Sequence, residues 1–484
     1  MAAAAVVLGV VVLSVVFGLI AVSANPIFIA FAVAMLVGPM LLLRPAWMVW
    51  FVLVGGLMVA GVVPLWFEGA GNKAVWGISL LSFLLMALAL VRALTSRDVR
   101  AGTPSFVWVM LVFMFFALFS AVVNGVTAYE LLSGFKRYFQ GFGLVLALVW
   151  LGFGAAQMQQ WSRFFVVLAL LQLPLAIYER VHFVPIREGL ARVLPNMVPI
   201  DVVAGTFGAG LYGGGSSAVL AAFLVILLGF LIAYSREGLI RQRRLWLLVP
   251  LVLSPLFLGE TKIVVVILPL IFVVLFWRQI LARPIVGVVG LAAGALLTVA
   301  AGFTYLQISA KKVSLEDRIT DTVAYNFKDR GYGSYKLNRS TVLTFWARQQ
   351  SAKEPVSLVL GNGLGSAHEV TGGHLTRRYP NYGLGLTTVS ALLWEQGLIG
   401  TLLYLAGWAM AFVTAIRLRR TARDPLERAD LSGLIAGLAV VGLYMLYVDA
   451  PLQSLSYQIF TGVMFGRLAW LHRQRVLAPS ISAV

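Results

Sequence analysis

The chain has 484 residues, of which 60% are hydrophobic and only 12% are charged. Soluble domains are about 45–50% apolar and about 25% charged, so this composition excludes an ordinary soluble globular protein. The formal net charge of +18 does not indicate nucleic-acid binding, because Lys and Arg are spread over many short segments rather than gathered in one basic domain. A membrane with anionic headgroups, or an anionic substrate, accounts better for this charge.

The residues that usually hold metals are scarce in this chain. It contains no cysteine, which excludes disulfides and thiolate metal sites. We expect no metal and no cofactor, because the spacing of the four histidines is not that of metal ligands: His182, His368, His374 and His472.

Unbroken apolar runs of about 20 residues predict transmembrane helices, because backbone groups in hydrocarbon must be hydrogen-bonded within their own segment. The N-terminal run lacks the basic residues of a signal peptide, so we expect it to be retained as the first helix. The predicted fold is an all-α polytopic bundle of about fourteen helices, with about twelve as the lower bound. The expected spans are 4–24, 26–43, 46–66, 74–94, 105–124, 136–155, 162–180, 216–234, 245–260, 262–279, 285–305, 386–416, 431–449 and 452–471.

Lys and Arg collect in alternate loops between these spans, a pattern typical of cytoplasmic loops. Both termini are therefore expected in the cytoplasm. The chain divides into an N-terminal part of the bundle (1–305), a large polar loop outside the cell membrane (306–385), and a C-terminal part with a cytoplasmic tail (386–484). A loop of about 80 residues usually carries function.

The segment 245–279 has basic clusters at both ends, which predicts a hairpin of two crossings. Arms of about 16 residues span about 24 Å, less than the hydrocarbon thickness of about 30 Å. The tip is therefore expected in a recess lined by protein. There, Lys262 either binds a pyrophosphate or forms an internal ion pair with Glu260.

The large loop contains a predicted short helix followed by a glycine-rich turn. Ser340 is a candidate cap for a helix over 341–350, whose apolar face would lie on the membrane or on the bundle. In the turn, Gly361, Gly363 and Gly365 permit positive φ and close approach of a ligand, although the same pattern fits a plain turn.

Charged residues near the outer ends of two spans are further candidates. Glu395 lies inside an apolar helix, where a carboxylate indicates a site or a paired contact. Lys136 and Arg137 precede a span, where they either bind an anion or reach the membrane surface as a snorkelling pair.

These stretches together resemble the O-antigen ligase and O-antigen polymerase superfamily of bacterial envelope proteins. The family pattern is an Arg that opens a loop helix, a G-x-G-x-G-S turn, and a transmembrane segment containing E-x-G-L-I-G. Arg339, Gly361–Ser366 and Glu395–Gly400 match it in order, and the resemblance covers about 337–408. Family ligases and many polymerases carry His-Asn about nine residues before the glutamate, where this chain has Leu386-Thr387.

The resemblance implies a metal-independent glycosyltransferase in the bacterial inner membrane, with the large loop in the periplasm. It would polymerise polyprenyl-pyrophosphate-linked oligosaccharide repeat units of a surface polysaccharide. Arg339, Glu395 and His374 are the expected catalytic residues, with His374 or His368 in place of the missing histidine. The expected pyrophosphate- and glycan-binding residues are Lys262, Glu260, Lys136, Arg137, Arg348, Arg377, Arg378, Gly361, Gly363 and Gly365.

Three alternatives remain open from the sequence: a ligase that transfers the glycan to a lipid A core, a flippase or other transporter of lipid-linked oligosaccharides, and a scaffold for envelope assembly. A transporter usually shows two similar halves, whereas the one large polar loop here lies late in the chain. The expected partners are the lipid-linked glycan, membrane lipids, and a chain-length regulator or flippase, with no nucleic acid.

Overall fold

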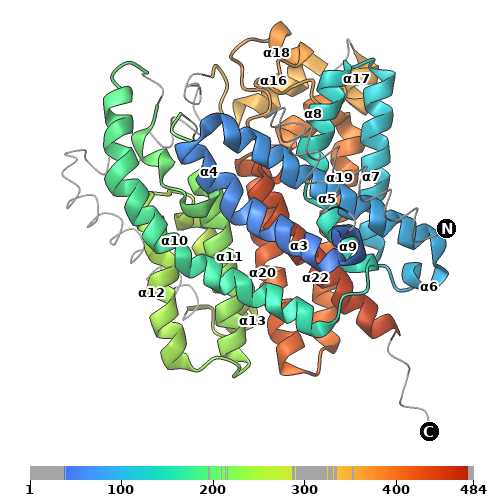
Figure 1. The fold of residues 1–484 in the computed structure, drawn as a ribbon, viewed down its shortest axis with the longest axis vertical. Helices are drawn as coiled ribbons and strands as arrows, with labels where there is room; N and C mark the ends of the chain where they lie inside the picture. Colours follow the sequence, from blue (N-terminus) through green and yellow to red (C-terminus); the bar gives the residue numbers. More distant parts are fainter. Residues whose placement is uncertain are drawn as a thin grey trace, which may run out of the picture.

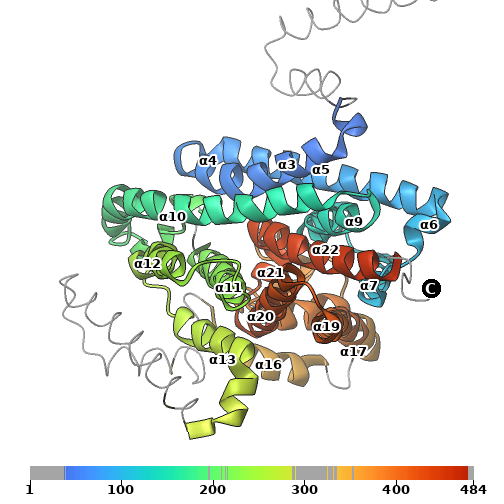
Figure 2. The same ribbon diagram turned by 90° about the horizontal axis from the view of Figure 1, so that it is seen from below.

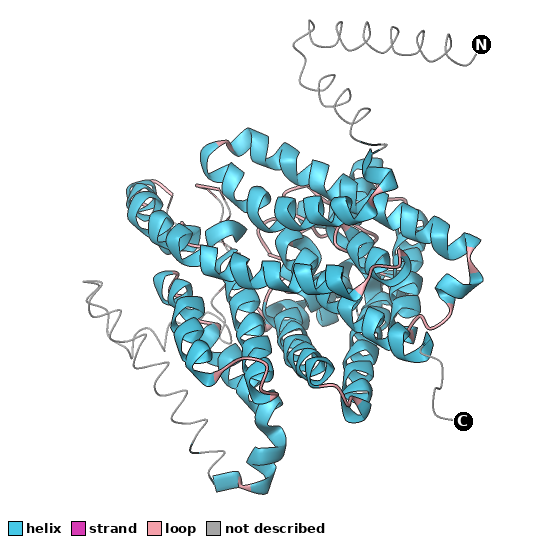
Figure 3. Cartoon of the chain, turned by 60° about the horizontal axis from the view of Figure 1, so that its bottom comes forward, coloured by secondary structure: helices cyan, strands magenta, loops and turns pink. Residues whose placement is uncertain are grey.

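The computed structural model describes residues 40–194, 197–208, 216–285, 335–350 and 354–477, with a few isolated positions besides. All the regular elements in these residues are helical (Figure 3). The predicted span 4–24, most of 26–43 and nearly all of 285–305 lie outside the described residues. The expected total of about fourteen helices therefore stays a prediction.

Several long helices run roughly parallel to one another, other long helices cross them, and short helices cover one end of the bundle (Figure 1 and Figure 2). Their bounds are α3 Pro45–Val54, η1 Gly55–Val59, α4 Ala60–Trp66, α5 Glu68–Thr95, α6 Arg97–Arg100, α7 Ser105–Val123, α8 Ala128–Phe139, α9 Phe142–Trp150, α10 Ala155–Leu190, η2 Pro199–Val202, η3 Gly205–Phe207, α11 Ser216–Arg236, α12 Gln242–Leu258, α13 Val264–Ala282, α16 Thr341–Gln350, α17 Pro355–Leu360, α18 His374–Arg378, α19 Thr388–Thr421, α20 Pro425–Tyr447, α21 Ala450–Gln453 and α22 Leu455–Leu477.

Eight helices in the described part of the chain are long and apolar enough to cross a membrane. This confirms an all-α membrane bundle and agrees with the hydropathy pattern, because each of these helices overlaps a predicted span. Their bounds are Pro45–Trp66, Val75–Thr95, Ser105–Val123, Ala155–Leu190, Ser216–Arg236, Val264–Ala282, Thr388–Thr421 and Pro425–Tyr447.

The structure corrects the predicted continuous span 136–155, which is interrupted between α8 and α9. Gly141 stands at the interruption, and its N–H donates to Oε1 of Gln458 in α22 at 3.1 Å. A Cβ at Gly141 would lie 2.6 Å from the Cβ of Gln458, so the chain turns where it touches α22. Hydropathy could not reveal this turn, because its cause lies more than 300 residues away in the sequence.

The short hairpin is present as α12 and α13, which meet at a tip of five residues, 259–263. Helix α12 has 17 residues, or about 26 Å at 1.5 Å per residue, which agrees with a short arm. Helix α13 has 19 residues, or about 29 Å, and is longer than the predicted arm. Glu260 in the tip has φ of 48°, a left-handed conformation that is uncommon outside glycine.

The basic loops gather at the end of the bundle opposite α16, α17 and α18 (Figure 1). There, Arg419 and Arg428 both pair with Glu237, at 2.9 and 2.6 Å, and Arg475 pairs with Glu427 at 2.6 Å. We call this the basic end, and the opposite one the loop end. Which end faces the cytoplasm stays a prediction.

Helix α16 has the predicted bounds, but Asn338 rather than Ser340 caps it. The side-chain oxygen of Asn338 accepts hydrogen bonds from the N–H groups of Ser340 and Thr341 at 3.0 and 2.8 Å. Val342 and Trp346 are buried, and the indole N–H of Trp346 donates to the carbonyl of Leu393 in α19. The apolar face of α16 therefore packs on the bundle.

Candidate functional site

Helix α19 is interrupted in its first third by a single glycine. Gly397 has φ of 62° and ψ of −163°, a conformation that is essentially restricted to glycine. Just before it, the carbonyl of Trp394 accepts from the N–H of Asn362 at 3.0 Å, and that of Glu395 accepts from the N–H of Gly363 at 2.9 Å. The glycine-rich turn thus supplies hydrogen bonds where the helix is interrupted, next to the buried Glu395.

The three glycines of the turn all have positive φ, and each touches another part of the protein. A Cβ at Gly361 would lie 2.4 Å from the backbone of Glu395, and one at Gly365 would lie 2.3 Å from the carbonyl of Glu130 in α8. A Cβ at Gly363 would meet the side chain of Val126 at 2.5 Å. These contacts explain the glycines by packing, and their predicted contact with a ligand stays a prediction.

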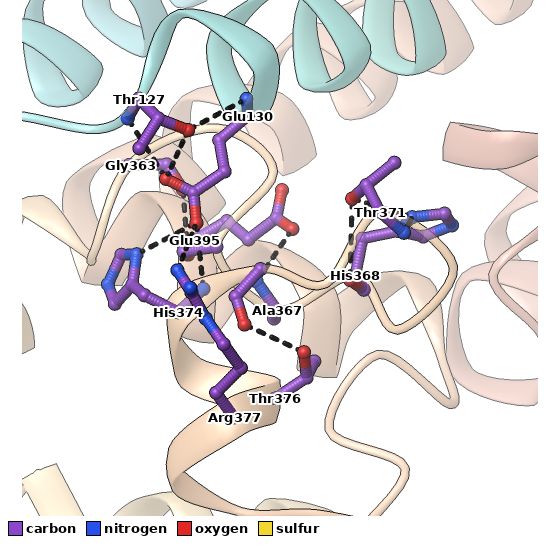
Figure 4. A network of polar contacts seen from close by, with 12 residues as sticks. Thr127, Glu130, Gly363, Ala367, His368, Thr371, His374, Thr376, Arg377 and Glu395 are labelled. Atoms are coloured by element: carbon purple, nitrogen blue, oxygen red, sulfur yellow. Dashed lines mark hydrogen bonds and ion pairs between the residues drawn. The ribbon is translucent and has the colours of Figure 1, made fainter.

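Glu395 and Arg137 form a buried ion pair whose hydrogen bonds are incomplete. The closest oxygen and nitrogen lie 3.6 Å apart, and the side chains are only 2% and 11% exposed. One Glu395 oxygen accepts from the N–H of Ala367 at 3.1 Å (Figure 4). The carboxylate also interacts with the buried hydroxyl of Tyr138, but its other oxygen has no well-formed hydrogen bond among the described residues. Nε and Nη2 of Arg137 also lack one there. Buried charges with open hydrogen-bonding positions are typical of functional sites.

Arg339 is held over the end of α20, at the start of α16. Its Nε donates to the carbonyl of Tyr447 at 2.6 Å, and the guanidinium carbon lies 4.2 Å from the centre of the Tyr447 ring. The hydrogen bond and the cation–π contact together fix the direction of the side chain. The predicted catalytic arginine is therefore anchored to the bundle rather than free in the loop.

Asp449 follows α20 directly and was not among the predicted site residues. Burial raises the pKa of its carboxyl to about 6, against the lowering effect of the positive charges of Arg137 and Arg339. Asp449 is thus within electrostatic reach of both arginines. An acidic residue at the end of an apolar span was a signal in the sequence, but the predicted span 431–449 placed it inside a helix.

His368, and not His374, belongs to the group around Arg137. Its Nδ1 accepts from the N–H of Thr371 at 3.3 Å, so Nε2 carries the proton and donates to Oε1 of Gln453 at 3.2 Å. Burial and the positive charge of Arg137 lower the pKa of His368 to about 3, although the Gln453 contact acts in the opposite direction. The imidazole is therefore neutral at pH 7.

His374 contacts Glu130 instead, and this contact links the loop to α8 (Figure 4). A Glu130 oxygen accepts from the backbone N–H of His374 at 2.7 Å and is 3.3 Å from its ring nitrogen Nδ1. Burial raises the pKa of Glu130, but hydrogen bonds from Thr127 and His374 outweigh burial and leave the pKa below its usual value. A catalytic role of His374 stays a prediction.

The other predicted loop arginines lie at the surface. Arg377 is 3.9 Å from Glu130, and Arg378 pairs with Glu354 at 3.2 Å, with side chains 69% and 56% exposed. Arg348 is exposed on α16. Lys136 differs from them, because its ammonium lies 4.3 Å from the centre of the Trp76 ring in α5.

The hairpin tip belongs to a second polar group. Glu260 lies 3.6 Å from Arg180 of α10. Burial raises the pKa of Asp201 in η2, while the positive charges of Arg187 and Lys262 lower it, which brings Lys262 into the same group.

We define the central group as Arg137, Arg339, His368, Glu395 and Asp449, with Gln453 as a neighbour. Its members come from α8, the start of α16, the loop after α17, α19 and the end of α20. Two guanidinium groups beside a titratable carboxyl can bind an anion and accept a proton. No protein-family model and no curated protein matches the chain.

Proposed function

We propose that this chain is a membrane glycosyltransferase that polymerises polyprenyl-pyrophosphate-linked oligosaccharide repeat units of a surface polysaccharide. The observation that carries the proposal is the central group, in which Glu395 is buried and the other members are half-buried, at the loop end of a membrane bundle. The bundle gives access to a lipid-anchored substrate, and the loop end offers polar surface for its glycan.

The proposed reaction joins two lipid-linked chains. A hydroxyl oxygen of the acceptor sugar attacks the anomeric carbon of the donor sugar and forms the new glycosidic bond. The bond between that carbon and the lipid pyrophosphate breaks, and its electron pair stays on the phosphate oxygen. The proton of the hydroxyl passes to a base of the enzyme.

Arg137 and Arg339 would stabilise the negative charge that develops on the leaving pyrophosphate. Guanidinium groups suit phosphate oxygens, and fixed charges act more strongly in a buried site than in water. Glu395 would act as a positioning residue, because it pairs with Arg137 and is itself held by the N–H of Ala367. Arg339 is positioned in a similar way by Tyr447.

Asp449 is our first candidate for the general base, because it lies within electrostatic reach of both arginines and its raised pKa lets a carboxylate accept a proton near neutral pH. His368 is a weaker second candidate, because its pKa of about 3 makes the ring a poor proton acceptor near neutral pH and its Nδ1 already accepts from the N–H of Thr371. Either residue would take the place of the histidine that the resembled family carries before the glutamate.

The test is a reaction of the purified protein in nanodiscs with a lipid-pyrophosphate-linked repeat unit, with and without EDTA. Product length is followed on a gel for the wild type, Arg137→Lys and Arg339→Ala. Arg420→Ala is the matched control for Arg339→Ala, because it removes the same charge from an exposed position at the basic end. Arg137→Lys keeps the charge and changes the shape of the cation. We expect a ladder of products with or without EDTA, unchanged in the control and at least about tenfold weaker in the other two variants.

Two results would replace this proposal with another function. Transfer of the glycan to a lipid A core, without chain growth on the polyprenyl carrier, would make the protein a ligase. Movement of the intact lipid-linked unit across a liposome membrane, with no new glycosidic bond, would make it a transporter.

A further inference from the structure

Helices α8 and α9 are separated at a backbone hydrogen bond that a side chain replaces. In a continuous α-helix, the carbonyl of Arg137 would accept from the N–H of Gly141, four residues later. Here that N–H donates to Oε1 of Gln458 at 3.1 Å, while Nε2 of Gln458 donates to the carbonyl of Arg137. The amide of Gln458 therefore stands between the two groups and bonds to both. A side chain inserted in this way is a known cause of a break in a helix.

Gln458 reaches the break because α22 comes very close to the chain there. The residue is only 7% exposed, and Figure 2 shows α22 alongside α9. A Cβ at Gly141 would lie 2.6 Å from the Cβ of Gln458, and one at Gly462, a turn later in α22, would lie 3.1 Å from the carbonyl oxygen of Gly141. The two glycines thus permit an approach that side chains at these positions would prevent.

A second buried glutamine holds the same turn. Gln140 is 2% exposed, and its Oε1 accepts from the hydroxyl of Ser79 in α5 at 3.1 Å. Its Nε2 donates to the carbonyl of Gln453 at 3.1 Å, and the side chain of Gln453 is the partner of His368. The break is therefore fixed by polar side chains that connect it to the central group.

The guanidinium of Arg137 is held less firmly by its own contacts than that of Arg339. The nearest oxygen of Glu395 is 3.6 Å away, and Nε and Nη2 have no well-formed hydrogen bond among the described residues. Arg339, in contrast, donates to the carbonyl of Tyr447 at 2.6 Å. The place of the Arg137 side chain therefore depends more on its backbone, which Gln458 holds through the carbonyl of the same residue.

We propose that Gln458 is a positioning residue for Arg137. Because it replaces one helical hydrogen bond, it fixes the last turn of α8 in the place where the guanidinium faces Glu395 and the pyrophosphate of the donor. Without the amide, the N–H of Gly141 could bond directly to the carbonyl of Arg137, and the guanidinium would move with the rebuilt helix. This role rests on the proposed glycosyltransferase function, which supplies the pyrophosphate.

The test is a double-mutant cycle on chain growth by the full protein in nanodiscs, with kcat and KM expressed per amount of folded protein. Gln458→Met removes both polar atoms at a similar side-chain length, and Gln458→Asn keeps the amide but shortens it by one methylene. Each change is made in the wild type and in an Arg137→Gln background. The matched control is Gln172→Met, which removes another buried amide, one that bonds to Leu168 and Thr206.

We expect both Gln458 variants to lower kcat about tenfold in the wild-type background, with little change in KM, because Arg137 acts on the charge that develops in the transition state. In the Arg137→Gln background, the same changes should lower kcat less than about twofold, since no guanidinium remains to be positioned. Gln172→Met should leave kcat unchanged, even where it lowers the unfolding temperature. Should Gln458→Met fail to fold, Gln458→Asn decides.

Three outcomes would overturn the inference. Full activity of the folded Gln458 variants would remove the positioning role and leave the proposed function intact. An equal loss in both backgrounds would show that Gln458 supports only the fold. A wild type that extends no chain would contradict the proposed function itself, and the role of Gln458 would fail with it.

Discussion

At the scale of single residues, Glu395 forms an ion pair with Arg137, and both side chains have little exposure to solvent. Glu395→Gln keeps an oxygen that can accept from the N–H of Ala367, but it leaves the Arg137 charge without its partner. Removing one partner of a buried ion pair costs about 3–5 kcal/mol, and we expect the lower value because the pair lies 3.6 Å apart. Thermal unfolding in detergent measures the effect.

The matched control is Glu354→Gln, which removes the same charge from an ion pair with Arg378 that is largely exposed. Exposed pairs contribute about 0–1 kcal/mol, so the unfolding temperature should hardly change. Equal shifts in the two variants would show that the Arg137 pair is no more important than a surface contact.

We expect substitution of Asp449 to change activity and stability in opposite directions. Its pKa of about 6 lies above the usual value of 3.8, so the folded protein holds a proton there that the unfolded chain has lost. Stability at this residue therefore falls as the pH rises from about 4 to about 6. Asp449→Asn should remove that loss and raise the free energy of unfolding at pH 8 by about 1–2 kcal/mol.

If Asp449 is the general base, the rate of polymerisation in the wild type should rise with pH through an apparent pKa near 6. Asp449→Asn should be more stable and yet at least about a hundredfold slower, with the pH dependence lost. A pH–rate profile together with unfolding at pH 8 separates the roles. A stable variant with full activity would leave His368 as the base.

At the scale of the helix, Gly397 sets the bend of α19. Gly397→Ala would strain the backbone and place a Cβ 2.4 Å from the N of Gly361 and 2.6 Å from the carbonyl of Val359. We expect a loss of about 3 kcal/mol or more, seen as a lower unfolding temperature or as aggregation on size-exclusion chromatography. Gly407→Ala in the same helix is the control, since its Cβ would meet Met110 at an ordinary 3.5 Å. Similar behaviour of both variants would contradict a special role of the bend.

The sequence predicted elements better than it predicted the site. Helices α7 and α11 lie within two residues of their predicted bounds, because a membrane helix is defined by its own run of apolar residues. The interruption at Gly141 depends on Gln458, and the grouping of Arg137 with Asp449 joins residues more than 300 positions apart. Contacts at such separations leave no periodic pattern in a single sequence, which is also why His374 was preferred over His368.

At the scale of the whole molecule, the two ends of the bundle differ in charge and in cover. At the basic end, ion pairs of Glu237 and Glu427 with arginines connect neighbouring helices. The short helices α16, α17 and α18 lie at the loop end, which also holds the central group. Because Lys and Arg are retained on the cytoplasmic side of membrane proteins, we expect the basic end to face the cytoplasm. The central group would then face the outside. The proposed reaction could take place there, because it uses lipid-linked units and needs no nucleotide-activated sugar.

The absence of cysteine from the chain makes this orientation directly testable, because each introduced cysteine is the only one that can be labelled. Val370→Cys lies in the loop after α17 at a residue that is 89% exposed, and Arg420→Cys lies exposed at the basic end of α19. A membrane-impermeant maleimide applied to intact cells, or to spheroplasts where an outer membrane blocks it, should label Val370→Cys alone. Arg420→Cys should react only after the membrane is permeabilised. Labelling of Arg420→Cys in sealed cells would place the central group in the cytoplasm and exclude a polymerase that acts outside.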